Sequence, residues 1–395
     1  MRSLALFSLL PVCLLAACSF DPSEDADVEG GEPAEAESAI VPITQPDETA
    51  PASSLAPAPL KWTETSLVDV RGVGDSGWSK THEQTPISPA FGAALDRFDG
   101  TGHSYRGDLS FINWETVVGK SCSQFGSAYS PGRSYAFVSR PENLTQAYDH
   151  GFNLVGLSNN HARDCYASSE TTERGEAASP AMTAKGIASL GDLEWLTAGV
   201  AGIGEDDSAR AKVRTFTIKG RDVRVAFGSL YTGRPSCPRA ACSGDANALF
   251  SSLRDAQADL RIVALHSMAA ADQDELVRMG IRFVEQYGGD VVFGHGPHVW
   301  KPVRVVRKQS GGKGVVFESL GNFIHPSLGA QSRNYIGRAL FDPETLALRQ
   351  VQVIPIANAG ADVRFSSTDA MGLESNLRWT RLAGSNTAVY ANVKP

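Results

Sequence analysis

The stretch VVFGHGPHVW, residues Val291–Trp300, places two histidines on a short turn directly after an apolar run that is typical of a buried strand. Glycine lets the backbone approach other groups closely and proline stiffens a turn, so the imidazoles of His295 and His298 can converge on one point. Convergent imidazoles are typical of a metal site. Two histidines on a turn are as often a surface feature, so this hypothesis requires further ligands elsewhere in the chain.

Short apolar runs alternate with helix-like segments along most of the chain. The runs are rich in Val, Ile, Leu and Phe and span residues 68–75, 109–115, 152–158, 223–230, 260–267, 290–296 and 314–323. Helices are expected at residues 141–150, 180–190, 246–256 and 272–287. This alternation predicts an α/β fold in which helices cover the faces of a sheet. A β-hairpin is expected around residues 342–345, and residues 357–395 have no clear pattern.

Polar side chains gather at the ends of five of these apolar runs. They are Asp75, Asn113 with Glu115, Asn159 to His161, His266, and His295 with His298. In α/β folds the chemistry collects at the carboxyl ends of the strands. Carboxylate, amide oxygen and imidazole together suit divalent Mn, Fe or Zn, and the lack of cysteine among them favours an open catalytic site over a structural zinc.

The series GD, NWE, SNNHARD, LH, GHGPH and SLGNF, in this order, resembles the CapA family, which is associated with bacterial poly-γ-glutamate capsule synthesis. That family is similar to the calcineurin-like metallophosphoesterases. The resemblance covers the chain from about Val68 to Pro355. It implies a four-layer α/β/β/α sandwich, with two mixed sheets packed face to face and helices outside. We expect this domain to span residues 61–356 and a C-terminal extension to span residues 357–395.

The resemblance also implies a role for each strand-end residue. Asp75 would bind the first of two divalent ions, Glu115 would bridge both, and His298 would complete the first. Asn160, His266 and His295 would bind the second ion. His161 would stay off the metals as the general acid, because the pKa of an imidazole lies near working pH.

Other polar residues of these motifs have open roles. Asn113, Asp164 and Asn322 would support the ligands or contact substrate. Asn113 and Asn322 could instead be ligands themselves or bond only within their loops, and Asp164 could orient a histidine or simply cap a turn. His325 follows SLGNF and could line the site, although a lone histidine is more often structural.

Two positions depart from the family pattern. Many calcineurin-like enzymes have a histidine two residues after the first aspartate, where this chain has Gly77. The family usually reads HWG and an acidic residue where His266 is followed by Ser267, Met268 and three alanines. The first metal site is therefore expected to be one ligand short, and polar groups for substrate are missing near His266.

The resemblance implies a dinuclear-metal hydrolase or transferase that acts in the synthesis or export of a capsule or another cell-envelope polymer. Its substrate would be that polymer or a phosphoester. Two alternatives remain open: a non-catalytic envelope scaffold that kept the fold, and a general periplasmic metallophosphodiesterase.

The N-terminus predicts export. Residues 1–17 read as a signal peptide, because Arg2 precedes an apolar run too short to span a bilayer comfortably. Residues 15–18, LAAC, resemble a bacterial lipobox, which implies lipid attachment at Cys18; a plain secreted protein is the alternative. We therefore expect a membrane-anchored lipoprotein of the bacterial envelope that faces the periplasm or the exterior.

Residues 18–60 are rich in Asp, Glu, Pro and Ala and have almost no large apolar side chains, so we expect a disordered tether. This segment carries ten acidic side chains, while the whole chain has a formal net charge of −8, so the rest is close to neutral. A near-neutral domain without a basic stripe is not expected to bind nucleic acid.

Four cysteines lie beyond the N-terminal segment, and an even number in an exported protein favours disulfides over thiol chemistry. Cys237 and Cys242 are separated by four residues, which suits a local bridge. Cys122 and Cys165 would then form the other pair and join two loops that each follow a candidate site motif. The spacing alone leaves other connectivities open.

Overall fold

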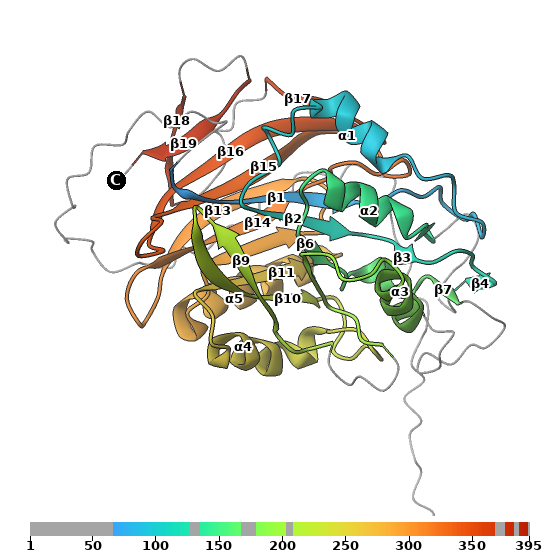
Figure 1. Ribbon diagram of the computed structural model, residues 1–395, viewed down its shortest axis with the longest axis horizontal. Helices are drawn as coiled ribbons and strands as arrows, with labels where there is room; N and C mark the ends of the chain where they lie inside the picture. The colour runs from blue at the N-terminus through green and yellow to red at the C-terminus, as the bar shows by residue number, and fades with distance from the viewer. Residues whose placement is uncertain are drawn as a thin grey trace, which may run out of the picture.

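The computed structural model describes residues 66–125, 135–166, 179–202, 208–367, 376–382 and 387–393 (Figure 1). The predicted signal peptide, Cys18 and the acidic tether lie outside these residues. Within the described part of the chain, no helix is both long and apolar enough to cross a membrane.

A mixed sheet of nine strands contains the first candidate ligand. Its order is β18-β19-β16-β15-β1-β2-β6-β8, and β17 also pairs with β16. The strands are β1 Val68–Ser76, β2 Leu109–Trp114, β6 Leu154–Gly156, β8 Leu196–Ala198, β15 Gln331–Phe341, β16 Leu348–Ala359, β17 Asp362–Phe365, β18 Arg378–Arg381 and β19 Tyr390–Val393. β1, β2, β6 and β8 run parallel, and β15 pairs antiparallel with β1.

A second mixed sheet has six strands in the order β13-β14-β12-β11-β10-β9. The strands are β9 Lys212–Ile218, β10 Arg221–Tyr231, β11 Leu260–His266, β12 Val291–His295, β13 Trp300–Arg307 and β14 Lys313–Leu320. β10, β11, β12 and β14 run parallel, and β9 and β13 are antiparallel edge strands.

The two sheets bury one apolar core between them. Phe111 of β2 stacks on Phe293 of β12 with ring centroids 4.7 Å apart. Helices α1 Phe91–Asp99 and α2 Glu142–Asp149 pack on the outer face of the first sheet, and α4 Ala246–Asp255 and α5 Ala270–Tyr287 cover the outer face of the second (Figure 1). The predicted α/β class is confirmed.

Short elements lie at the end of the sheets that carries the candidate site. β3 Val117–Val118 pairs with β5 Val138–Ser139, and β4 Gln124–Phe125 pairs with β7 Cys165–Tyr166. The 3-10 helix η2 spans Asn160–Arg163, η3 spans Ser243–Asp245, and α3 Ser179–Ala188 packs against β3. Both expected disulfides, Cys122–Cys165 and Cys237–Cys242, are present.

The structure adds elements that the sequence pattern missed. α1 was not predicted, because its nine residues carry only a short apolar stripe. The domain boundary that we placed after residue 356 lies inside β16, and β17 and β19 both pair with this strand. The described part of residues 357–395 therefore extends the first sheet. These strands are only four residues long, and β19 pairs with a part of β16 that is distant in the sequence, so their local pattern is weak.

A buried ion cluster holds β1 beside β15. Arg71 of β1 faces Arg338 of β15 in the strand register. Both guanidinium groups bind the carboxylate of Asp69, with Nη2 of Arg71 at 2.8 Å and Nη2 of Arg338 at 2.7 Å from Oδ2. Burial alone would raise the pKa of Asp69, but the two arginines outweigh this effect and hold its pKa below the usual range.

The Asp69→Asn variant is expected to lose about 3–5 kcal/mol of unfolding free energy, because two buried guanidinium groups would lose their carboxylate. Chemical denaturation measures this loss. Asp192→Asn is the control, since that side chain is 91% exposed beside Arg214 and its loss should leave the midpoint unchanged. Equal midpoints for the Asp69 variant and the wild type would contradict the structural role of this cluster.

Candidate metal centre

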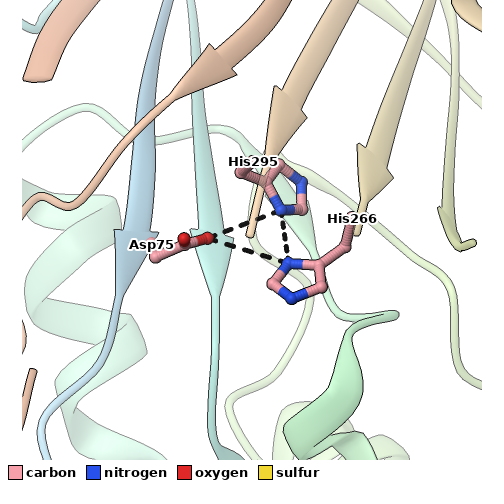
Figure 2. A group of neighbouring side chains, drawn as sticks. All are labelled: Asp75, His266 and His295. Carbon is pink, nitrogen blue, oxygen red and sulfur yellow. Dashed lines mark hydrogen bonds and ion pairs between the residues drawn. The ribbon is translucent and has the colours of Figure 1, made fainter. Parts of the chain in front are cut away.

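The predicted ligands meet at the carboxyl ends of β1, β2, β11 and β12. Asp75 pairs with Asn113 in the register of β1 and β2, and His266 pairs with His295 in that of β11 and β12. Because the sheets pack face to face, Asp75 of the first sheet lies close to His266 and His295 of the second (Figure 2). The strand-end prediction therefore placed these four residues together.

Asp75 is fully buried and lies at the centre of the cluster. Its Oδ1 is 3.5 Å from Nδ1 of His295 and 3.7 Å from Nδ1 of His266 (Figure 2). Its Oδ2 is 3.1 Å from Nδ1 of His298 and accepts a hydrogen bond of 3.0 Å from the backbone N–H of Gly296. One carboxylate thus contacts all three histidines.

Two groups of side chains could each hold a metal ion, and both include Asp75. One is Asp75 with His266 and His295, and the other is Asp75 with Glu115 and His298. The second group corresponds to the ligands expected for the first ion. Glu115 was expected to bridge the ions, whereas in this geometry Asp75 is common to both groups. Oε1 of Glu115 is 3.5 Å from Nε2 of His266, so Glu115 also lies close to both groups.

Two glycines permit this approach. A Cβ on Gly296 would lie 1.6 Å from the backbone oxygen of Ser267, so any side chain there would separate the loops that follow β11 and β12. A Cβ on Gly74 would lie 1.7 Å from the backbone oxygen of Gly321. The glycines of the GD and GHGPH motifs are therefore required by close backbone contacts.

The protonation states suit metal binding. Burial lowers the pKa of His295 to about 3 and that of His266 well below its ordinary value, so both rings are neutral near pH 7. Their Nδ1 atoms lie 2.7 Å apart, a contact that two charged rings could not make. Burial opposes ionisation of Asp75, but the hydrogen bond from His298 and the proximity of His266 hold its pKa below the usual range. Neutral imidazole and ionised carboxylate are the forms that bind metals.

Unsatisfied polar atoms also fit a metal site. Among the described residues, Oδ1 of Asn160 and Nε2 of His295 are buried and have no hydrogen-bond partner. A buried polar atom without a partner costs about 1–3 kcal/mol. An amide oxygen and an unprotonated imidazole nitrogen are both metal-binding atoms, so these donors fit the expected divalent ions.

Two asparagines support the ligands. Nδ2 of Asn113 donates to Oδ1 of Asp75 at 2.8 Å. Oδ1 of Asn322 is 2.7 Å from Nδ1 of His298, which therefore carries the proton and donates. These contacts place Asn113 and Asn322 in the supporting positions that we predicted as one of two possibilities.

The carboxylate of Asp164 holds the ring of His161. Its Nδ1 is 2.7 Å from Oδ2 of Asp164, which also accepts a hydrogen bond of 2.7 Å from the backbone N–H of Phe137. The backbone N–H of His161 donates to Oδ1 of Asn159, the N-cap of η2. Burial raises the pKa of Asp164, and the contact with His161 opposes this rise. The arrangement fixes the orientation of the imidazole through Nδ1, so Nε2 is the ring nitrogen that could transfer a proton to substrate.

A model of the bacterial capsule synthesis protein family PGA_cap matches residues 73–327, which contain every predicted ligand. The chain belongs to this family. The matched segment also contains the end of β1 that carries Asp75, together with β2, β6, η2, β11 and β12, so the PGA_cap match and the candidate site coincide.

Two solved structures are similar to this PGA_cap chain. A novel phosphatase from Mycoplasma pneumoniae has 12% sequence identity and a TM-score of 0.44, and the match covers 74% of this chain and 95% of that one. A hypothetical protein from Thermus thermophilus has 15% identity and a TM-score of 0.40, with coverage of 72% and 96%. No curated protein matches the sequence.

Sequence reasoning left His325 as a residue that could line the site, and it missed Phe137 and the approach of His325 to Gly77. The ring of Phe137 lies 4.4 Å from that of His161 and 4.6 Å from that of His325. A Cβ on Gly77 would lie 2.7 Å from Cδ2 of His325. The imidazole of His325 therefore occupies the space where a side chain at position 77 would lie. The position of His325 two residues after SLGNF was the only signal, since Phe137 belongs to no motif.

The His325→Gln variant tests the titration of this buried ring. Burial lowers the pKa of His325 to about 3 from an ordinary value of 6.5, so the unfolded chain binds a proton that the folded chain does not. Stability contributed by the neutral ring is present above pH 6.5 and is lost as the pH falls toward 3. Glutamine does not titrate, so the slope of unfolding free energy against pH should fall by up to about 1.4 kcal/mol per pH unit.

Urea denaturation at several pH values, with a chelator present, measures this slope. His103→Gln is the control, because His103 is exposed. An unchanged slope in the His325 variant would contradict the burial of a neutral ring.

Proposed function

We propose that this chain is a dinuclear-metal hydrolase or transferase that acts on phosphoester bonds or related linkages of a capsule or another cell-envelope polymer. The observation that carries the proposal is that two possible ligand groups share the carboxylate of Asp75. A two-metal centre needs a carboxylate that can bridge the ions. Membership of the PGA_cap family supports the role in capsule synthesis.

The expected ligands have distinct parts in this proposal. Asp75, Glu115 and His298 would hold one ion, and Asn160, His266 and His295 would hold the other, with Asp75 or Glu115 between them. Mn, Fe or Zn ions held there would polarise the ester and lower the pKa of water so that it can attack at neutral pH.

His161 would act as the general acid. With its Nδ1–H donated to Asp164, a protonated ring carries its second proton on Nε2. As the bond between phosphorus and the leaving oxygen breaks, that oxygen would take the proton from Nε2 and leave a neutral imidazole. The attacking water or acceptor hydroxyl forms the new bond to phosphorus and loses its own proton to solvent. General acid catalysis of this kind contributes about 10²–10⁴-fold.

We also propose that the protein is exported and anchored at Cys18 by lipid, facing the periplasm or the exterior. Support comes from the signal-like N-terminus and from two disulfides, which persist mainly in oxidising compartments. The membrane contact would then be the lipid alone.

Metal content and activity of the purified protein test the catalytic proposal. Wild-type protein should bind about two ions per chain and hydrolyse phosphodiesters with Mn²⁺, as expected of a two-metal site. His295→Ala should lose metal and activity together. His161→Ala should keep the metal and lose about 10²–10⁴-fold in kcat.

His103→Ala is the matched control, because this exposed histidine lies in no motif and its loss should change neither quantity. A wild-type protein without metal would overturn the proposal and favour the scaffold. Full activity in both site variants would also overturn the proposal, because the activity would then come from outside this site. Hydrolysis of every simple phosphodiester with no action on envelope polymer would favour a general phosphodiesterase.

A further inference from the structure

The position of the proposed general acid depends on a single short turn. η2 has four residues and begins at Asn160, and Asp164 directly follows its last residue. Oδ2 of Asp164 makes both contacts that fix the local geometry, one to Nδ1 of His161 and one to the backbone N–H of Phe137. Any displacement of Asp164 would therefore move the ring of His161.

The described residues directly after Asp164 form only a two-residue strand. The next two residues form β7, Cys165–Tyr166, which pairs with the equally short β4, Gln124–Phe125. The backbone N–H of Ser123 donates to the carbonyl of Tyr166 at 2.8 Å. Two-residue strands are marginal on their own, because isolated two-stranded pairs are barely stable in water.

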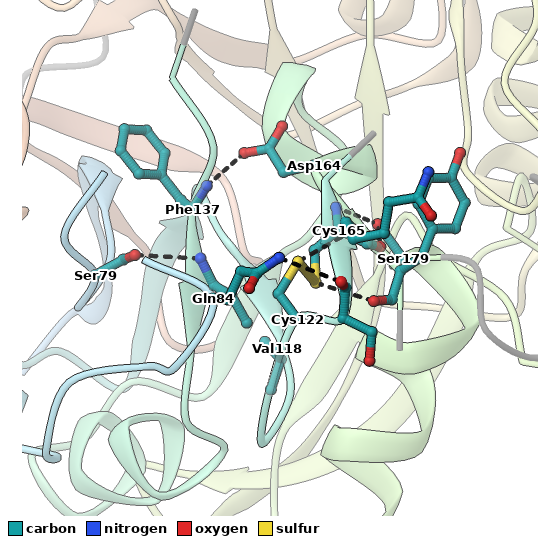
Figure 3. Close-up of a disulfide and its surroundings, with 12 residues drawn as sticks. Ser79, Gln84, Val118, Cys122, Phe137, Asp164, Cys165 and Ser179 are labelled. Atoms are coloured by element: carbon teal, nitrogen blue, oxygen red, sulfur yellow. Dashed lines mark hydrogen bonds between the residues drawn. A yellow bond between two sulfur atoms is a disulfide. The ribbon is translucent and has the colours of Figure 1, made fainter. Parts of the chain in front are cut away.

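The disulfide Cys122–Cys165 lies at this point (Figure 3). Cys165 is the residue directly after Asp164, and both cysteines are buried, with exposed fractions of 0% and 3% for Cys165 and Cys122. The backbone N–H of Cys165 also donates to the hydroxyl of Ser179 at 2.7 Å, at the start of α3. The bridge is therefore a covalent anchor next to the carboxylate that orients His161.

The other end of the bridge is tied to the strand end that carries Glu115. Cys122 follows β3, whose Val118 is supported by α3 through a hydrogen bond of 3.0 Å between its N–H and the hydroxyl of Thr183. The N–H of Cys122 donates to the carbonyl of Gln84 at 2.7 Å, and Nε2 of Gln84 donates to the carbonyl of Ser123 at 3.2 Å. Figure 3 shows the surroundings of the two sulfur atoms.

We propose that Cys122 and Cys165 are positioning residues for proton transfer: their disulfide holds Asp164, and through it the imidazole of His161, at a fixed place relative to the loop that follows Glu115. This inference rests on the proposed function, since it concerns the general acid of that reaction. The second bridge, Cys237–Cys242, lies elsewhere, in the loop between β10 and α4.

The dependence of rate on the leaving group separates this role from a structural one. A p-nitrophenolate group leaves without a proton, whereas an alkoxide needs the general acid. The Cys122→Ser/Cys165→Ser protein, with its Cys237–Cys242 bridge intact, should keep its metal. Its kcat for an alkyl phosphodiester should fall at least about tenfold more than its kcat for bis-p-nitrophenyl phosphate, as part of the general-acid contribution is lost.

Asp164→Asn is the reference variant and should give the same unequal loss. Cys237→Ser/Cys242→Ser is the matched control, because it removes a bridge of the same kind and should affect both esters equally. If the serine pair at 122 and 165 fails to fold, mild reduction of the folded Cys237→Ser/Cys242→Ser protein removes the Cys122–Cys165 bridge alone, without refolding.

Equal losses on both esters, no loss at all, or loss of bound metal in the Cys122→Ser/Cys165→Ser protein would overturn the inference. The NMR signals of the His161 ring provide a readout that needs no substrate: the Nδ1–H signal of the hydrogen bond to Asp164 should weaken when the bridge is removed. A wild-type protein without metal or activity would overturn the proposed function, while an unchanged Nδ1–H signal would overturn the positioning role by itself.

Discussion

The carboxylate of Asp75 is the point on which the rest of the site depends. It is fully buried, accepts hydrogen bonds from Asn113 and from the backbone of Gly296, and lies within 3.7 Å of His266. A buried carboxylate is costly unless charges or hydrogen bonds offset its desolvation. Here side chains from both sheets offset that cost. The geometry of the site therefore depends on the face-to-face packing of the two sheets.

The register of β1 connects this site to the core. At one end of β1, Asp69 binds Arg71 and Arg338 and so holds β15 beside β1. At the other end, Asp75 pairs with Asn322 in the segment after β14, which brings the SLGNF motif to the ligands. The register of β1 with β2 shifts between Val73 and Asp75, so the alternation of side chains set at Asp69 does not continue to Asp75. The pairing of Asp75 with Asn113 and Asn322 places its carboxylate instead.

Around His161 the structure relies on other means. Regular strands end before η2, and the local contacts are a cap from Asn159, a carboxylate from Asp164 and a covalent bridge at Cys165. A proton-transferring ring must be held in a narrow range of positions to be effective. In the described residues 115–125 and 157–166, regular structure is limited to two-residue strands and the four-residue η2, which do not hold a ring in place on their own. The disulfide links these two segments.

Much of the site could be predicted from the sequence, because its residues stand directly after apolar runs. His266, His295 and Asp75 each lie at the end of a strand, and the carboxyl ends of parallel strands lie at one edge of a sheet. The same reasoning could not find Phe137, which lies in a loop outside every motif, or the approach of His325 to Gly77, which comes from contacts between distant segments.

The sequence by itself determined the α/β class, the set of ligand types and the strand ends that carry them, because apolar periodicity and motif spacing are local properties. Only the tertiary structure decided which carboxylate is shared by the two ligand groups and that the described part of residues 357–395 extends the first sheet. Both depend on the packing of two sheets and on pairing between distant strands. Sequence spacing does not specify the distances between atoms that such contacts bring together.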